Sequence, residues 1–282
     1  MANVAFLGTG LLGAAMVEGL LRRGDVVTVW NRTEAKARAL EPLGARVAAT
    51  PGDAVAGADR VHMTLPDDTV VDHLVNAFAP RLRPGTIVID HSTTAPGGTK
   101  TRLERLSRAG VPFIHAPVFM APQMARESVG FMLVSGPRPL FERVQDALAR
   151  MTGEVWYLGE RGEIAAAYKL FGISMFLVIA AGLADVFAMA KNLGLAPTEA
   201  LEVFSKFQPG NVIKGRGEKM ARGDFSAAFE LTMARKDLRL MLEAAGNQPL
   251  AVLPGIATRM DEAIANGHGH EDVGVIALQV VK

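Results

Sequence analysis

The chain has 282 residues, a formal net charge of +1 and no cysteine. This length is sufficient for two domains with separate cores, and the near-neutral charge gives no sign of a nucleic-acid partner or a membrane surface. The lack of cysteine excludes disulfides, thiolate catalysis and zinc–thiolate sites, and it suits the cytoplasm, where we expect the protein.

The first thirty residues predict a strand, a glycine turn, a helix and a second strand. Residues 4–7 and 26–30 are short apolar runs, typical of buried parallel strands. Gly8, Gly10 and Gly13 form the pattern G-x-G-x-x-G, in which glycine allows a tight turn, the approach of a pyrophosphate and close packing of a helix on the sheet. Because both strands and the helix flank this motif, it predicts a dinucleotide site. The expected contacts are Gly8, Gly10, Leu11, Leu12 and Gly13.

The residues after the second strand indicate which dinucleotide is bound. Enzymes that select NAD usually have Asp or Glu here, which bonds the ribose 2′-hydroxyl, whereas this chain has Asn31, Arg32 and Thr33. A carboxylate would repel a 2′-phosphate, but a guanidinium binds it through paired charged hydrogen bonds. The alternative is that Arg32 is a solvated surface residue. We expect NADP as the cofactor, with all three residues among its contacts.

Strands and helices alternate up to residue 158, as in a doubly wound parallel sheet. Further strands are expected at residues 45–48, 59–66, 86–90, 111–116, 130–135 and 155–158, and helices at residues 34–43, 50–56, 99–109 and 140–151 and after Asp67. Ligands of such sheets lie outside the carboxyl ends of the strands, so Leu65, Pro66, Ser92 and Thr93 are expected cofactor contacts. The alternative for each is structural, as the start of a helix or as its hydroxyl cap.

Beyond residues 160–164 only helices are expected. They span residues 162–194, 197–207, 211–222, 229–245, 250–266 and 270–281. We therefore predict an NADP-binding Rossmann-type domain at residues 1–162 and an all-helical substrate and dimerisation domain at residues 163–282. The most apolar run, Leu170–Ala184, is shorter than the roughly 20 residues of a membrane span, so a buried helix is expected. The first strand begins too early for a signal peptide, and none is expected.

Lys169 is the candidate acid–base residue, near the start of the long helix. Its neighbours one turn away are Ala165, Ala166, Gly172 and Ile173, among which an ammonium is poorly solvated. Poor solvation lowers the pKa of a lysine and suits it to proton transfer near neutrality. The alternative is a lysine that extends from an apolar helix to solvent.

The other polar residues give weaker indications. His62, His73, His91 and His115 are scattered singly, and His268 and His270 flank glycines in a turn, so no metal site is expected. Lys236 and Asp237 are mid-helix, where a charged outer face is the simplest interpretation.

The whole chain resembles the β-hydroxyacid dehydrogenase family, which includes 3-hydroxyisobutyrate dehydrogenases and glyoxylate or succinic semialdehyde reductases. The matching motifs, in the family's order, are residues 6–13, 31–33, 63–67, 90–93, 116–118, 159–169 and 236–238. The resemblance implies that Lys169 exchanges a proton with the substrate oxygen, that Lys236 lies over the cofactor and that Thr93 or its neighbour contacts the nicotinamide ribose. It also implies a helical domain similar to the C-terminal domain of 6-phosphogluconate dehydrogenase. Related imine reductases share the fold but typically replace the lysine.

Two segments depart from the family pattern. The family follows Ala-Pro-Val with Ser-Gly-Gly, which binds the substrate carboxylate, and this chain has bulkier residues there. One turn after its lysine the family has Asn, and this chain has none. Both changes favour a larger or more apolar substrate. The expected substrate contacts are Val118, Phe119, Met120, Ala121, Gly172 and Ile173.

Together these features predict an NADP-dependent oxidoreductase that transfers hydride between nicotinamide and a small hydroxy acid, semialdehyde or other carbonyl. An imine reductase with an apolar pocket is one alternative, and a non-catalytic NADP-binding sensor or scaffold is another. The expected partners are a small-molecule substrate and a second copy of the chain, because family members usually pair through the helical domain. Neither nucleic acid nor a membrane is expected as a partner.

Overall fold

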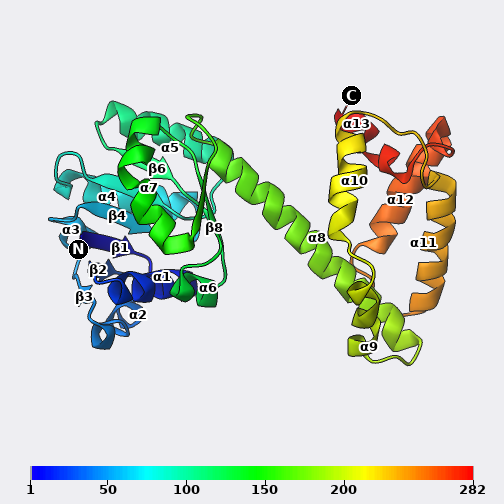
Figure 1. Ribbon diagram of the computed structural model, residues 1–282, viewed down its shortest axis with the longest axis horizontal. Coiled ribbons are helices and arrows are strands. Elements are labelled where there is room, and N and C mark those ends of the chain that lie inside the picture. Colours follow the sequence, from blue (N-terminus) through cyan, green and yellow to red (C-terminus); the bar gives the residue numbers. More distant parts are fainter. Residues whose placement is uncertain (1, 282) are drawn as a thin grey trace. The chain divides into compact units, whose positions relative to one another are not determined.

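The computed structural model describes residues 2–281. The chain divides into two compact units, Met1–Ile173 and Ser174–Lys282, and each is described by itself (Figure 1). The division falls within one helix, α8 (Ile164–Asn192). The domain boundary predicted at residues 162–163 lies just before this helix and stays a prediction.

A six-stranded parallel sheet forms the centre of the first unit. The strands are β1 (Asn3–Leu7), β2 (Val26–Trp30), β3 (Arg46–Val47), β4 (Arg60–Met63), β5 (Ile87–Asp90) and β6 (Phe113–His115), in the order β3-β2-β1-β4-β5-β6. Because β1 pairs with both β2 and β4, the strand order reverses beside β1. Doubly wound sheets bind their ligands at this point. The Rossmann-type architecture predicted from the sequence is confirmed.

Helices cover both faces of this sheet, because its strands send alternate apolar side chains into two buried cores. Val4 and Phe6 belong to the core shared with α1 and α7, whereas Ala5 and Leu7 belong to the core shared with α3, α4 and α5. The helices are α1 (Leu11–Arg22), α2 (Glu34–Arg38), α3 (Pro51–Val55), α4 (Asp68–Phe78), α5 (Pro96–Arg108) and α7 (Arg138–Thr152). The helix expected at residues 34–43 is shorter, and its last part is a separate 3₁₀ turn at Glu41–Leu43.

A second, three-stranded sheet follows β6. Strand β7 (Val118–Phe119) pairs antiparallel with β8 (Phe131–Val134), which pairs parallel with β9 (Glu154–Tyr157). Strands β8 and β9 were expected, but β7 and the helix after it, α6 (Pro122–Glu127), were not. A two-residue strand is too short to show alternation. Pro122 at the first helical position is the signal that could have indicated α6.

The described part of the second unit is helical, as predicted. Its helices after α8 are α9 (Pro197–Leu201), α10 (Gly210–Ala221), α11 (Leu231–Ala245), α12 (Leu253–Ala263) and α13 (Leu278–Val281), with shorter turns at Glu202–Ser205, Ile264–His268 and Val273–Ala277. Leu231 and Leu238 of α11 pack with Met260 of α12 in its core. The connection into α12 is held by the buried Asp185 of α8, which accepts hydrogen bonds from the three backbone N–H groups of residues 251–253.

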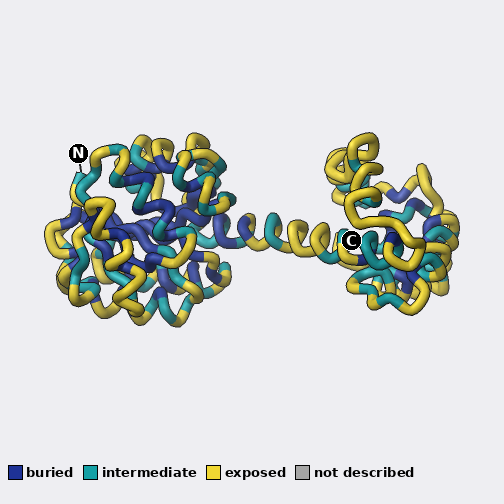
Figure 2. Tube along the Cα trace, turned by 90° about the horizontal axis from the view of Figure 1, so that it is seen from below, coloured by how far each residue is buried: buried dark blue, intermediate teal, exposed yellow. Residues whose placement is uncertain are grey.

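Helix α8 differs from the sequence prediction in its burial. We expected residues 170–184 to form a buried helix, but only 6% of the most apolar window of α8 is buried (Figure 2). Phe171 and Phe176, for example, are 63% and 65% exposed. The physical reason is that apolar side chains occupy all sides of the helix, so neighbours on one side leave the others uncovered. By length and composition alone, α8 could also cross a membrane.

Candidate active site

The turn after β1 has the shape that the glycine motif requires. Gly8 has a φ of +94°, which disfavours other residues, and a Cβ there would overlap the Thr64 carbonyl oxygen. A Cβ on Gly13 would overlap the Gly8 carbonyl oxygen, so α1 starts in direct contact with the turn. Gly10 caps α1 without a side-chain hydrogen bond and has open space around it. The N–H groups at the start of α1 can therefore donate hydrogen bonds to a pyrophosphate.

The end of β2 contributes an amide and a guanidinium. Asn31 Oδ1 accepts a hydrogen bond from the Thr9 backbone N–H (3.0 Å), and its Nδ2 donates to the Thr33 carbonyl oxygen (2.9 Å), so Asn31 ties the glycine turn to the end of β2. Arg32 is exposed and forms no ion pair within residues 2–281. Its guanidinium is available to a phosphate beside the turn.

The ends of β4 and β5 are joined to each other by hydrogen bonds. The Leu65 N–H donates to Ser92 Oγ (2.9 Å), and the Ser92 N–H donates to Asp90 Oδ1 (2.9 Å). Helix α5 has Ala95 as its N-cap, without a side-chain hydrogen bond, so neither Ser92 nor Thr93 caps it. That structural alternative is not found. Ser92 instead links two loops at the carboxyl edge of the sheet, where Thr93 is exposed.

Lys169 lies in the first turns of α8 and is only 8% exposed. Its Nζ donates a hydrogen bond to the Val118 carbonyl oxygen (2.8 Å) and lies 4.0 Å from the centroid of the Phe119 ring. Burial disfavours the ammonium and lowers the pKa of Lys169 below its ordinary value. The side chain therefore does not extend to solvent, which was the structural alternative.

Three of the predicted substrate residues, Val118, Phe119 and Gly172, lie together at Lys169. The Phe119 ring stacks on Phe131 of β8, with centroids 4.9 Å apart, and a Cβ on Gly172 would overlap that ring. The other three lie farther along the same segments. Met120 packs against the apolar core, Ala121 is the exposed N-cap of α6, and Ile173 is half-buried on α8.

A buried row of polar side chains crosses the first unit, and the sequence analysis did not predict it. Arg60 Nε donates to His62 Nε2 (3.1 Å), His62 Nδ1 lies 2.9 Å from His91 Nε2, and His91 Nδ1 lies 2.7 Å from the Ala116 carbonyl oxygen. Because the carbonyl only accepts, each neutral imidazole donates from Nδ1 and accepts at Nε2. Burial lowers the pKa of His91 to about 4 and that of His62 well below its usual value.

These histidines were expected to be scattered singly, but strand pairing brings two of them together. Residues 62 and 91 lie at the carboxyl ends of neighbouring strands, β4 and β5, and this adjacency is the signal that could have found them. Within residues 2–281, no group of three or more His, Asp or Glu side chains is placed to hold a metal ion.

Lys236 belongs to the second unit. It is exposed on α11 and forms an ion pair with the adjacent Asp237. This arrangement is that of a charged outer face, and the cofactor contact implied by the resemblance stays a prediction.

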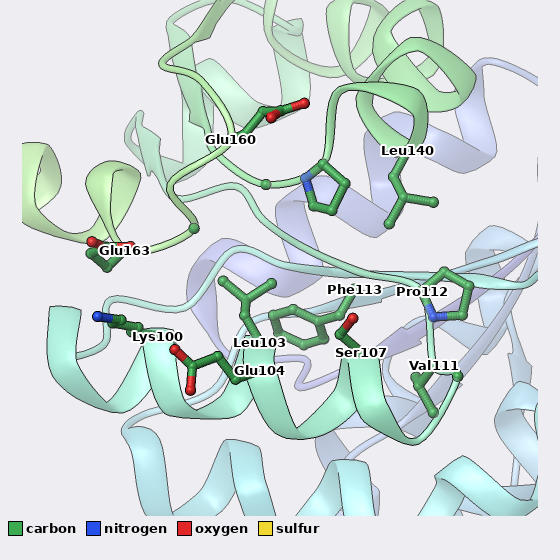
Figure 3. Close-up of a pocket in the computed structure, with 14 residues that line it drawn as sticks. Lys100, Leu103, Glu104, Ser107, Val111, Pro112, Phe113, Leu140, Glu160 and Glu163 are labelled. Carbon is green, nitrogen blue, oxygen red and sulfur yellow. The ribbon is translucent and has the colours of Figure 1, made fainter.

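A cavity of about 480 Å³ lies elsewhere in the first unit, beside α5 (Figure 3). Leu103 and Phe113 form part of its apolar wall, and Lys100, Glu104 and Glu163 lie toward one end. None of the predicted site residues lines it. The candidate site is therefore the carboxyl edge of the sheet together with Lys169.

Two family models together match almost the whole chain. Residues 3–159 match the NAD binding domain of 6-phosphogluconate dehydrogenase, and residues 165–279 match the NAD-binding domain of NADP-dependent 3-hydroxyisobutyrate dehydrogenase. The chain belongs to the β-hydroxyacid dehydrogenase family. It is an NAD(P)-binding oxidoreductase that acts on hydroxyl or carbonyl groups.

Two curated relatives match nearly all of this chain and most of their own length. A 2-(hydroxymethyl)glutarate dehydrogenase from Eubacterium barkeri is 26% identical over 282 residues, which cover 97% of this chain and 93% of that protein. A chloroplastic glyoxylate/succinic semialdehyde reductase 2 from Arabidopsis thaliana is 28% identical over 274 residues, covering 96% and 76%.

Among solved structures, an imine reductase from Myxococcus stipitatus in complex with NADP+ has a TM-score of 0.90. It is 20% identical, and the match covers 99% of this dehydrogenase and 100% of that chain. Identity this low shows a shared fold alone.

Proposed function

We propose that this dehydrogenase uses NADP and transfers hydride between the nicotinamide and a carbonyl or hydroxyl carbon, with Lys169 as the proton donor or acceptor. The observation that carries the proposal is the environment of Nζ. The Nζ atom is buried and donates a hydrogen bond to one carbonyl oxygen, and this burial lowers the pKa of Lys169. A lysine with a lowered pKa, positioned at one hydrogen bond, suits proton transfer.

The bound NADPH would supply the hydride. The glycine turn and the start of α1 would hold its pyrophosphate, and Arg32 would bind the 2′-phosphate. Asn31, Thr33, Leu65, Pro66, Ser92 and Thr93 would line the cofactor at the carboxyl edge of the sheet. During reduction, Lys169 Nζ–H would donate its proton to the forming alkoxide oxygen, and in oxidation the neutral amine would take it back.

The Lys169→Met variant tests the acid–base role. Loss of general acid–base catalysis typically costs about 10²–10⁴-fold in rate, so we expect kcat to fall by at least about a hundredfold. NADPH binding, followed by its fluorescence, should stay close to that of the wild type, since Nζ is bonded to the Val118 carbonyl oxygen and not to the glycine turn. Full turnover by this variant would refute the role.

A substrate panel separates this function from the alternatives. Small semialdehydes and ketones should be reduced faster than cyclic imines. Faster turnover of imines would favour an imine reductase, and NADPH binding without oxidation across the whole panel would favour a sensor or scaffold.

We also propose that the dehydrogenase works as a homodimer in the cytoplasm. Apolar side chains around α8 are exposed within one chain. The same helix of a second copy would bury them in a symmetric interface. Family members usually pair through the helical domain, which supports this assignment.

A further inference from the structure

The two places where this chain departs from the family pattern touch each other. Phe119 lies on β7, and Gly172 lies one helical turn after Lys169 on α8. A Cβ on Gly172 would overlap Phe119 Cζ and lie 2.7 Å from its Cε1. With the Phe119 ring in this position, only glycine fits at position 172 without a shift of the ring, so the two departures form one coupled feature.

The Phe119 ring is fixed on its other side by the small sheet. Phe119 and Phe131 are directly paired in the antiparallel register of β7 and β8, and their rings stack 4.9 Å apart with an interplanar angle of 23°. Stacking of this kind stabilises the pair beyond the burial of its apolar area. The ring is thus held between Phe131 and Gly172, with little freedom to move away from Lys169.

In this position, the Phe119 ring covers one side of the Lys169 ammonium. Lys169 Nζ has three N–H donors. One donates to the Val118 carbonyl oxygen at 2.8 Å, and the Phe119 ring centroid lies 4.0 Å from Nζ. The face of an aromatic ring is electron-rich, so it attracts the ammonium and repels an anion. A substrate oxygen that accepted a hydrogen bond from another of these N–H groups would place its neighbouring groups beside the ring.

We propose that Phe119, seated against Gly172, is a specificity-determining residue that selects carbonyl substrates whose chain, where it lies against the ring, is uncharged and apolar. A carboxylate in that place would lose hydration against an electron-rich ring and gain no hydrogen bond from it. This inference rests on the proposed role of Lys169 in carbonyl reduction.

Two aldehydes that differ by a terminal carboxylate, butanal and 4-oxobutanoate, test the selection. We expect the wild-type kcat/KM to be at least about tenfold higher for butanal than for 4-oxobutanoate, because the carboxylate of 4-oxobutanoate would be poorly solvated beside the ring. Phe119→Ser should reduce that ratio at least about tenfold, because it removes the apolar wall. A wild type that prefers 4-oxobutanoate, or an unchanged ratio in the variant, would overturn the inference.

Gly172→Ala tests the same wall without changing the ring. The added Cβ must displace Phe119, so this variant should also lose the preference for butanal. Gly255→Ala is the matched control, because it is an exposed helical glycine around which a Cβ meets nothing within 4 Å. An equal ratio for Gly172→Ala and the control would contradict the coupling.

Phe119→Leu separates the π face from the bulk of the side chain. It should keep the preference for butanal. Loss of the cation–π contact, about 0.5–1 kcal/mol, should move the alkaline limb of the reductive pH profile about half a unit lower, since the protonated lysine is less stabilised. An unmoved limb would refute the contact with the ammonium. The Lys169→Met variant distinguishes the two failures. Full turnover by Lys169→Met would remove the proposed function itself, whereas an inactive Lys169→Met together with an unchanged substrate ratio in Phe119→Ser would remove this inference alone.

Discussion

Arg32 is the residue on which the choice of cofactor depends at the end of β2. It is exposed and without an ion pair in the described chain, so it can direct its guanidinium to a 2′-phosphate. Arg32→Ala should weaken NADPH binding about 10–100-fold, the value of a hydrogen-bonded charged pair, and change NADH binding little. Fluorescence titration with both cofactors measures this. Arg38→Ala is the matched control, because Arg38 is already paired with Glu34 and Glu41. Equal losses for both cofactors in Arg32→Ala would contradict the assignment.

His91 makes the stability of the first unit sensitive to pH. Its pKa in the folded chain is about 4, below the ordinary value of 6.5, because burial disfavours the charged ring. The neutral ring therefore contributes stability that is fully present above about pH 6.5 and lost as the pH falls toward 4, about 3 kcal/mol in all. Urea unfolding at a series of pH values should show this loss.

Matched variants separate His91 from general acid denaturation. His91→Asn should lose less stability over this pH range than the wild type, although His62, with its pKa lowered in the same direction, retains part of the effect. His270→Asn should behave as the wild type, because that side chain is 93% exposed. An unaltered pH dependence in His91→Asn would show that its ring is not the sensitive group.

Single residues differ in how much of their surroundings the sequence predicts. The poor solvation of Lys169 follows from apolar neighbours on its own helix, and the side chain is 8% exposed. Its contact with Phe119 joins segments fifty residues apart in the chain, for which local spacing holds no information. The same is true of His62 and His91, which meet only through the pairing of β4 and β5.

At the scale of elements, the glycine turn contains one glycine that the fold requires and another that we expect to matter for binding alone. A Cβ on Gly13 would overlap the Gly8 carbonyl oxygen, whereas a Cβ on Gly10 meets nothing within 4 Å. Gly13→Ala should therefore lower both the free energy of unfolding, by about 1–3 kcal/mol as for other overpacked sites, and the affinity for NADPH. Gly10→Ala should unfold normally but bind NADPH more weakly, because its methyl group would face the pyrophosphate. Chemical unfolding and NADPH titration of both variants provide the test, and equal unfolding curves for Gly13→Ala and the wild type would contradict it.

Elements with a clear apolar pattern were predicted well, and those shaped by distant contacts were not. Strand β2 has the predicted bounds, Val26–Trp30, because its apolar run ends sharply at polar residues. Helix α12 begins at Leu253 rather than at residue 250, where Asp185 of α8 holds the preceding backbone N–H groups out of the helix. The carboxylate that sets this boundary lies far away in sequence.

At the scale of the whole molecule, the uncovered apolar surface of α8 predicts self-association. Sedimentation equilibrium at micromolar concentration should give twice the 30.0 kDa mass of one chain. Replacing Phe176 and Ile179, which are 65% and 52% exposed, with Glu should produce monomers, because two carboxylates would be buried in an apolar contact. His270→Glu, which adds one carboxylate at an exposed polar position, should leave the dimer intact. A monomeric wild type would refute the dimer.

Asp185 also bears on the environment in which α8 can exist. This residue is 1% exposed, and although burial raises its pKa, hydrogen bonds from three backbone N–H groups at the start of α12 hold the pKa below the ordinary value. Inserted into a lipid bilayer, the helix would lose these donors and place a carboxylate near hydrocarbon, at a cost of about 2.5–3.5 kcal/mol at the bilayer centre. The same side chain that anchors α12 therefore opposes transfer of α8 into lipid, despite its length and apolar composition.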